Sequence, residues 1–238
     1  MFLELLDVHS YYDKSHILQG IDLQLQQGEM VCLLGRNGVG KTTTLKSIMG
    51  MVTPADGQIL LDGKNIVGLL PYQIARLGVG IVPEDRRIFP SLSVHENLLI
   101  GIKAGHDQKA AGENFWDPDR AYTMFPRLKE LRSHMGNELS GGEQQMLSVV
   151  RTLMGNPQVL LVDEPTEGLA PILVKAVIEM LVDIQRSGVT ILLVEQNMKA
   201  VIGVASRFYI MSKGTIVFEG DRQSLEKADD VKRKYLEV

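Results

Sequence analysis

The sequence predicts an α/β fold with a parallel-sheet core, an antiparallel β edge and a helical subdomain. Four short nonpolar runs alternate with longer helical patterns, at Met30–Leu34, Val79–Val82, Val159–Val162 and Ile191–Val194. Nonpolar runs of this length are typical of strands that are buried on both faces of a parallel sheet. Residues 85–150 instead favour helices, which predicts the helical subdomain.

Length and charge narrow the classes of function. The 238 residues carry 25 Lys and Arg against 29 Asp and Glu, which gives a formal net charge of −4. This length suits one large domain or two fused lobes. The acidic balance argues against a protein whose main task is to bind nucleic acid, because a basic surface is typical of that class. The single cysteine, Cys32, excludes an internal disulfide, and we expect it to be a small core residue.

No segment of the sequence predicts a membrane span or a secretory signal. An uninterrupted nonpolar run of about 18 residues is absent, and the first residues include Glu4 and Asp7 where a signal would be basic and then apolar. We therefore expect a cytoplasmic chain that reaches a membrane only through a partner.

The N-terminal third predicts strands joined by turns. Phe2–Val8, Ile17–Leu25 and Gln58–Leu61 have strand patterns, which indicates a small antiparallel sheet at one edge of the core. A helix follows, with Pro71 near its start and Gly78 just beyond its end, the usual positions of these residues.

Helix starts are also marked further along the chain. Ser93–Glu96 and Ser140–Glu143 fit the capping box, so helices are expected to begin directly after each serine. Lys103–Asp117 is polar and contains glycine, which predicts a loop. Pro171–Arg186 is amphipathic and predicts a long surface helix.

A phosphate-binding pattern lies between the first nonpolar run and a helical segment. The pattern G-x-x-x-x-G-K-[ST] is met by Gly35, Arg36, Asn37, Gly38, Val39, Gly40, Lys41 and Thr42. Backbone N–H groups of such a loop and the following helix N-terminus favour an anion. We expect Lys41 to reach the β- and γ-phosphates, Thr42 to bind Mg²⁺, and Thr43 to lie in the same nucleotide site. A glycine-rich turn that matches by chance is the alternative, and the flanking strand and helix argue against it.

Two adjacent acids close the nonpolar run Val159–Val162. Asp163 is expected to face Thr42 and the Mg²⁺ shell, whereas Glu164 is expected to orient and polarise the attacking water. An acidic pair at a strand end is by itself more often a solvated turn. The phosphate-binding loop elsewhere in the chain favours the catalytic interpretation.

A third motif resembles the signature of ATP-binding cassette (ABC) ATPases, at Leu139–Gln145 (Leu-Ser-Gly-Gly-Glu-Gln-Gln). A capped helix start is the plainer interpretation, and the two are compatible. The resemblance extends from Phe2 to Leu236 with the motifs in family order. It implies a single ABC ATPase domain of the P-loop NTPase class over residues 1–238, in which 1–84 and 156–238 form the α/β core and 85–155 the helical signature subdomain.

The resemblance assigns further positions. In the family, ATP lies between one subunit's phosphate loop and the other subunit's signature motif. This implies that Ser140, Gly141 and Gly142 serve ATP bound to a partner chain. Tyr12 resembles the aromatic residue that stacks on adenine; Tyr11 is a weaker candidate, since it could equally pack at a strand edge. Pro165–Ala170 matches the loop that touches the opposite subunit.

Two positions depart from most of the family. Glu84 stands where glutamine is usual, and Gln196 stands where histidine is usual. Glu84 still offers an oxygen near the metal or the attacking water. Gln196 can donate a hydrogen bond to the γ-phosphate but cannot titrate as histidine does. A degenerate site is one interpretation, and the intact phosphate loop and acidic pair argue against it.

The departures resemble one subfamily, the ATPase subunits of branched-chain amino-acid importers. Pro83–Phe89, Gly168–Pro171 and Val194–Asn197 carry this likeness, although Asp85 replaces a glycine usual there. The resemblance implies an ATP- and Mg²⁺-dependent ATPase, peripheral at the cytoplasmic face of the membrane, that powers import of branched-chain or other hydrophobic amino acids. Its implied partners are integral membrane permeases, a second identical or homologous ATPase chain and, indirectly, a solute-binding protein, with no nucleic acid.

Other functions stay open at this point. Urea or amide uptake, lipid or lipopolysaccharide export, and a non-transport ABC ATPase are the alternatives. Arg86, Arg87 and Phe89 lie beside the segment that receives a permease helix in the family, and they are expected either to contact that helix or to form a solvated basic pair.

Overall fold

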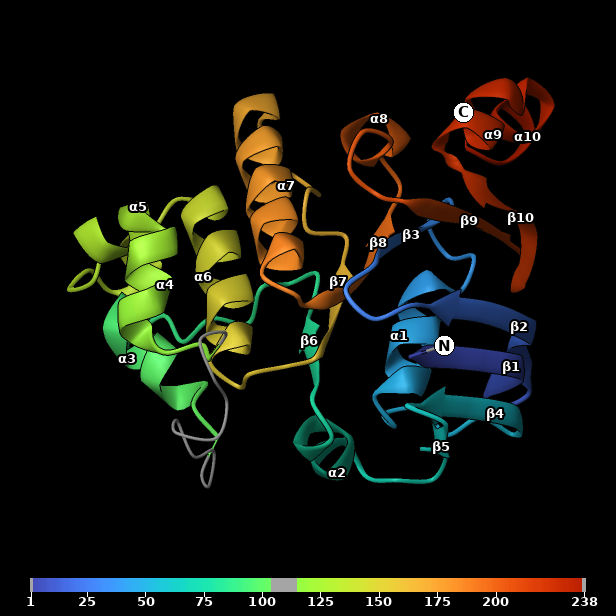
Figure 1. Ribbon diagram of the computed structural model, residues 1–238, viewed down its shortest axis with the longest axis horizontal. Helices are drawn as coiled ribbons and strands as arrows, with labels where there is room; N and C mark the ends of the chain where they lie inside the picture. The colour runs from blue at the N-terminus through green and yellow to red at the C-terminus, as the bar shows by residue number, and fades with distance from the viewer. Residues whose placement is uncertain (1, 104–114, 237–238) are drawn as a thin grey trace.

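The computed structural model describes residues 2–103 and 115–236, and within them the strands form two sheets (Figure 1). The larger sheet has the order β10-β9-β3-β8-β7-β6. Its strands are β3 (Met30–Leu34), β6 (Val79–Val82), β7 (Val159–Asp163), β8 (Thr190–Glu195), β9 (Arg207–Ser212) and β10 (Thr215–Asp221). The neighbours from β9 to β6 run parallel, which confirms the four predicted nonpolar strands.

Strands β9 and β10 are absent from the sequence prediction. They pair antiparallel across a two-residue turn, in which Lys213 has φ +46° and Gly214 has φ +79°. Two successive positive φ values are typical of the tight turns that join hairpin strands. The turn pair Lys213-Gly214 was therefore a usable signal for this hairpin.

The antiparallel strands expected at the edge of the parallel sheet form a separate sheet with the order β2-β1-β4-β5. Its strands are β1 (Leu3–Tyr12), β2 (Ser15–Leu25), β4 (Asp56–Leu61) and β5 (Lys64–Asn65). Helix α1 (Lys41–Ile48) lies between the two sheets, because Leu45 and Ile48 share one buried cluster with Leu5 of β1 and Leu33 of β3. The helix that follows the phosphate-binding pattern is therefore packed on both sides.

Four of the remaining helices begin where the sequence predicts, near Pro71, Val94, Gly141 and Pro171, and the starts of the others were not predicted. Their bounds are α2 (Pro71–Arg76), α3 (Val94–Ile100), α4 (Pro118–Met124), α5 (Pro126–Glu130), the 3₁₀ turn η2 (Gly136–Glu138), α6 (Gly141–Leu153), α7 (Pro171–Arg186), α8 (Met198–Val201), α9 (Arg222–Lys227) and α10 (Asp229–Tyr235). Ser93 and Ser140 both form the predicted capping boxes. Most of the loop predicted over Lys103–Asp117 falls outside the described residues.

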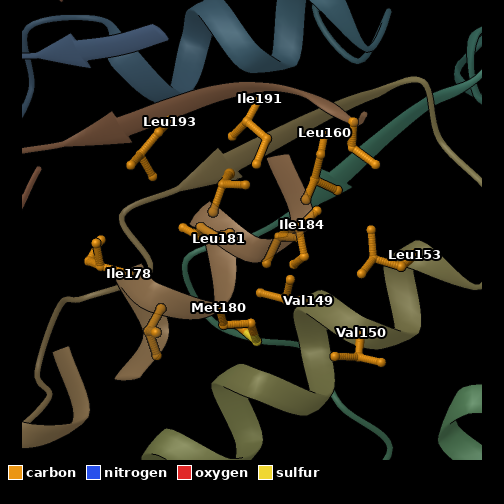
Figure 2. Packing of buried hydrophobic residues seen from close by; sticks show 14 of the residues in the cluster. Val149, Val150, Leu153, Leu160, Ile178, Met180, Leu181, Ile184, Ile191 and Leu193 are labelled. Atoms are coloured by element: carbon orange, nitrogen blue, oxygen red, sulfur yellow. The ribbon is translucent and has the colours of Figure 1, made fainter. Parts of the chain in front are cut away.

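Both faces of the inner strands β3, β7 and β8 are buried, which explains their nonpolar runs. In β7, Leu160 and Val162 belong to one core cluster, and Val159 and Leu161 belong to the other. Successive strand residues point to opposite faces, so each face needs its own nonpolar cover. Figure 2 shows one of these faces, where Leu160 packs toward α6 and α7.

Helices α3 to α6 gather on one side of the molecule, away from the antiparallel sheet (Figure 1). The exact boundaries 85–155 for a helical subdomain stay a prediction. Among residues 2–103 and 115–236, no helix combines the length and the nonpolar character needed to cross a bilayer.

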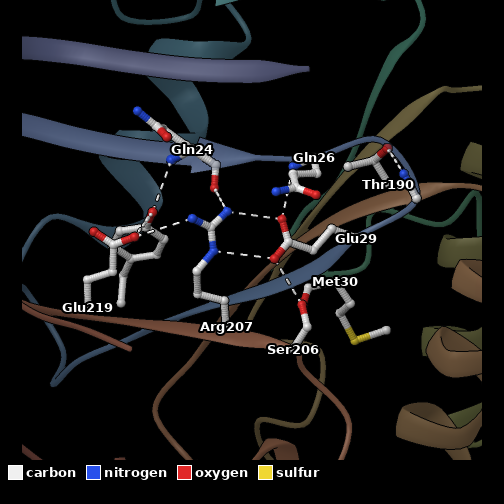
Figure 3. A network of polar contacts seen from close by, with 10 residues as sticks. Gln24, Gln26, Glu29, Met30, Thr190, Ser206, Arg207 and Glu219 are labelled. Carbon is white, nitrogen blue, oxygen red and sulfur yellow. Dashed lines mark hydrogen bonds and ion pairs between the residues drawn. The ribbon is translucent and has the colours of Figure 1, made fainter. Parts of the chain in front are cut away.

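A polar network ties the two sheets together (Figure 3). Arg207 of β9 donates to the Gln24 carbonyl of β2 at 2.7 Å and pairs with Glu29 at 3.0 Å. Glu29 also accepts from the Gln26 amide at 2.9 Å. Because both partners of the ion pair are largely buried, the network fixes β2 and β9 against each other at the end of β3 opposite the phosphate-binding loop.

Candidate nucleotide-binding site

The phosphate-binding loop joins the carboxyl end of β3 to α1, where ligands of parallel sheets usually bind. Gly38 has φ +79° and Gly40 has φ +117°, values that L side chains rarely adopt. At Gly35, an added Cβ would come within 2.7 Å of the Met211 carbonyl oxygen. Glycine is thus required at these three positions of the motif by backbone geometry and close approach.

Lys41 lies inside the loop, with only 3% of its side chain exposed. Its ammonium donates to the carbonyls of Gly35 at 2.8 Å and Arg36 at 3.0 Å. The same ammonium pairs with Oε1 of Glu164 at 3.0 Å. The residue expected to bind phosphate and the residue expected to activate water are therefore direct partners.

Asp163 faces Thr42, as the sequence predicts. The Thr42 hydroxyl donates to Asp163 Oδ1 at 3.1 Å. Burial raises the pKa of Asp163 from its ordinary 3.8 to about 6; the hydrogen bond from Thr42 and the charge of Lys41 act in the opposite direction, while Glu164 and Glu84 add to the rise. Two adjacent oxygen donors and a buried, undercompensated carboxylate suit a small divalent cation, so these residues fit Mg²⁺.

Replacing Asp163 with Asn is expected to stabilise the nucleotide-free protein in a pH-dependent way. The folded pKa lies above the unfolded one, so the folded state binds more protons between pH 4 and 6, and wild-type stability falls as pH rises through this range. The gain from Asp163→Asn therefore grows from pH 4 to pH 6 and levels off, at no more than about 3 kcal/mol. Urea unfolding without divalent cations measures it. Asp183→Asn on the exposed face of α7 serves as the control, and a pH-independent gain would contradict the assignment.

Glu164 has an unusual backbone conformation, with φ +43°. Non-glycine residues rarely adopt such values, and they persist where surrounding contacts fix them. The Glu164 amide donates to the Val194 carbonyl of β8 at 2.9 Å, and its carbonyl accepts from the Glu167 amide at 3.2 Å. These bonds turn the side chain out of the strand direction and toward Lys41.

A cavity of about 200 Å³ collects the candidate residues. It is lined by Tyr12, Ile17, Gly38, Gly40, Lys41, Thr42, Thr43 and Glu164. Tyr12 lines this cavity and is 44% exposed, so its side chain is accessible to a bound base. Tyr11 instead stacks on His16, with ring centroids 4.2 Å apart, so the edge-packing interpretation holds for Tyr11.

Glu84 and Gln196 are not among the described residues that line this cavity. Glu84 is exposed after β6 and acts on Asp163 through its charge. Gln196 is half-buried after β8, and its backbone N–H donates to Glu195 Oε2 at 3.2 Å. Glu195 is the residue that sequence reasoning missed. An acid that directly continues the nonpolar run Ile191–Val194 was the available signal.

The signature motif lies apart from the cavity. Ser140 caps α6, and Glu143 accepts from the Ser140 amide at 2.9 Å, so the capped-helix interpretation is confirmed. At Gly142, an added Cβ would come within 2.9 Å of the Leu173 side chain on α7, so a larger residue there would displace that side chain. Among the described residues that line the phosphate-loop cavity, none belongs to Leu139–Gln145.

Comparison with known proteins agrees with this geometry. Residues 18–167 match the family described as ABC transporter. The high-affinity branched-chain amino acid transport ATP-binding protein BraG of Pseudomonas aeruginosa is 38% identical, over 96% of this chain and 97% of that protein. The lipopolysaccharide export system ATP-binding protein LptB of Escherichia coli is 34% identical, over 94% of this chain and 92% of that protein.

Solved structures show the same fold. CbiO1 from Clostridium perfringens, part of an ABC transporter complex, is 26% identical with a TM-score of 0.82, covering 98% of this chain and 93% of that one. The ATP-binding cassette MJ1267 is also 26% identical with a TM-score of 0.82, covering 97% and 96%. The chain therefore belongs to the ABC transporter family, as one of its ATP-binding cassettes.

Proposed function

We propose that this chain binds and hydrolyses ATP to power an importer of branched-chain or other hydrophobic amino acids. The observation that carries the proposal is the meeting of two pairs at one cavity, Lys41 with Glu164 and Thr42 with Asp163. The solute class is supported by the 38% identity with BraG, against 34% with LptB. Urea or amide uptake and lipopolysaccharide export are outcomes that the test below distinguishes.

The Lys41–Glu164 pair gives the proposal a defined order of events. A phosphate chain in the loop competes with Glu164 for the Lys41 ammonium, because both are anions and the ammonium already donates to two carbonyls. Binding of phosphate therefore releases the Glu164 carboxylate. The freed carboxylate then accepts a hydrogen bond from water and polarises it for attack on the γ-phosphate.

Other residues hold the substrate. Thr42 and Asp163, with Glu84 nearby, would hold Mg²⁺, which when bound neutralises charge on the phosphate oxygens. The loop amides bind the phosphates, the Tyr12 ring stacks on adenine, and the Gln196 amide donates to the γ-phosphate.

The site needs a second chain in this proposal. Ser140, Gly141 and Gly142 serve ATP held by the phosphate loop of a partner cassette, either identical or homologous. The described lining of this chain's own cavity includes none of the three, which supports the division of labour. The loop Pro165–Ala170 contacts that partner.

A groove supports docking of a permease at the cytoplasmic face of the membrane. A cavity of about 250 Å³ lies between strand β6 and helices α3 and α6. Its lining includes Ile81 of β6, Ile100 of α3 and Arg151 of α6, together with Phe89. Arg87 pairs with Asp85 at 2.9 Å, and Arg86 lies against Gly141, so Phe89 alone of the three predicted contact residues lines this groove. A solute-binding protein would deliver substrate to the permeases.

Transport by the complex tests the proposal. The chain is purified with its co-purifying membrane subunits, reconstituted into vesicles and supplied with ATP and the solute-binding protein. We expect uptake of labelled leucine that requires ATP hydrolysis. ATP-driven movement of urea or lipopolysaccharide in place of leucine would overturn the solute class, and failure to co-purify with any membrane subunit would favour a non-transport ATPase.

A further inference from the structure

The side chain of Glu195 lies buried between two loops of the nucleotide site, and the mechanism above does not use it. It is 2% exposed at the carboxyl end of β8. Its Oε1 accepts from the amide of Thr166 at 3.1 Å and from the Thr166 hydroxyl at 2.8 Å. Its Oε2 accepts from the backbone N–H groups of Gln196 at 3.2 Å and Asn197 at 3.4 Å.

The carboxylate thus joins two segments that carry chemistry. Thr166 follows the acidic pair by two residues, and Gln196 is the residue proposed to bind the γ-phosphate. The backbone of Glu195 adds a third link, because its carbonyl accepts from the amide of Gly35 at the start of the phosphate loop, at 3.3 Å. One residue therefore contacts all three segments around the γ-phosphate position.

A buried carboxylate at this position costs desolvation free energy, and the packing of β8 does not require an acid there. Burial raises the pKa of Glu195, and the nearby charge of Glu164 adds to the rise. The preceding β8 residues Ile191–Val194 are nonpolar and fill the core without such a penalty. A buried polar group is stabilising only when its hydrogen bonds are satisfied, and here both oxygens are used to order loops.

The conformation of Glu164 supplies the reason to order them. Its φ of +43° must be maintained by surrounding contacts. On one side the Glu164 amide bonds Val194, the residue that precedes Glu195. On the other side the chain is fixed by two hydrogen bonds, which the backbone N–H and the hydroxyl of Thr166 donate to the Glu195 carboxylate.

We propose that Glu195 is a positioning residue for ATP hydrolysis. Its carboxylate clamps two segments by hydrogen bonds to Thr166 and to the backbone of Gln196, so that the Glu164 carboxylate and the Gln196 side-chain amide are aligned on the same γ-phosphate. The inference rests on the proposed function of Glu164. Loss of the Glu195 clamp is expected to lower kcat and leave ATP affinity almost unchanged, because Lys41 and the phosphate-loop amides are not among the partners of its side chain.

The test removes one bond of the clamp and restores it. Thr166→Val deletes the hydroxyl donor and keeps the amide donor, and Thr166→Ser restores the hydroxyl. At saturating ATP, in the assembled complex, we expect kcat of Thr166→Val to fall about tenfold, as for loss of one hydrogen bond to a charged group, with Kd for ATP within about twofold. Thr166→Ser is expected to recover most of the rate. Thr190→Val is the matched control, since this buried threonine lies at the other end of the same strand and bonds Gly28.

A double-mutant cycle identifies Glu195 as the partner. Glu195→Gln leaves a carboxamide NH₂ facing donors, and we expect a fall in kcat at least as large as that of Thr166→Val. The double variant is expected to be no slower than Glu195→Gln alone, because both act through one clamp. Losses that multiply, or a normal kcat in Glu195→Gln and Thr166→Val while Glu164→Gln is inactive, would overturn the positioning role. Normal hydrolysis by Glu164→Gln would instead overturn the proposed function.

Discussion

Glu164→Gln is expected to lower ATP turnover by roughly 10²-fold or more while ATP binding is retained, the scale for loss of a positioned base. Glutamine keeps the size of the side chain but cannot accept a proton from water. The substitution also removes the anion that pairs with Lys41 at 3.0 Å, so ATP affinity should stay equal or increase. Phosphate release at saturating ATP measures turnover, and equilibrium binding of ATP measures affinity.

Glu179→Gln is the matched control for this experiment, because Glu179 is an exposed acid on helix α7 outside the nucleotide site. We expect its turnover to change far less than that of Glu164→Gln. Near-normal hydrolysis by Glu164→Gln would refute the assignment of Glu164 as the group that activates water, whatever the control shows.

Lys41→Ala is expected to weaken ATP binding by about 10- to 100-fold, as for loss of a charge-assisted hydrogen bond to phosphate. The Lys41 ammonium is the one side-chain cation among the residues that line the described cavity. Its removal also leaves Glu164 buried without its cation, which places a negative charge beside the phosphates. Titration with a fluorescent ATP analogue measures the affinity.

Lys46→Ala provides the comparison for Lys41→Ala, because Lys46 lies on the same helix α1 outside the cavity. We expect ATP affinity of this control within about twofold of the wild-type value. Equal affinity of Lys41→Ala and wild type would contradict the phosphate-binding role.

The parts of the fold that the sequence predicts are those with a local pattern. Strand β7 is nonpolar on both faces because each face meets its own core cluster, and this requirement is visible in four consecutive residues. Strand β10 has no such pattern, since most of its residues are half-buried or exposed. The sequence also does not predict that the antiparallel strands form a separate sheet, because a local residue pattern does not determine with which strands a strand pairs.

The site shows the same limit. Motif spacing predicts that Thr42 and Asp163 meet, because a phosphate loop and an acid at a strand end share the carboxyl edge of a parallel sheet. The Lys41–Glu164 pair and the clamp around Glu195 depend on rotamers and loop conformations. The sequence shows Glu195 as an acid that ends a nonpolar run, but its four side-chain hydrogen-bond partners are visible only in the structure.

In the proposed function, one chain holds only half of a hydrolytic site, and a partner chain supplies the signature motif. The decisive measurement is ATP hydrolysis by the wild-type chain against the concentration of a second cassette that carries Lys41→Ala to silence its own phosphate loop, with and without Ser140→Arg in that second cassette. We expect turnover of the wild-type chain to rise with the concentration of the second cassette, and Ser140→Arg in that cassette to abolish the rise. Turnover that is independent of concentration and unaffected by Ser140→Arg would contradict it.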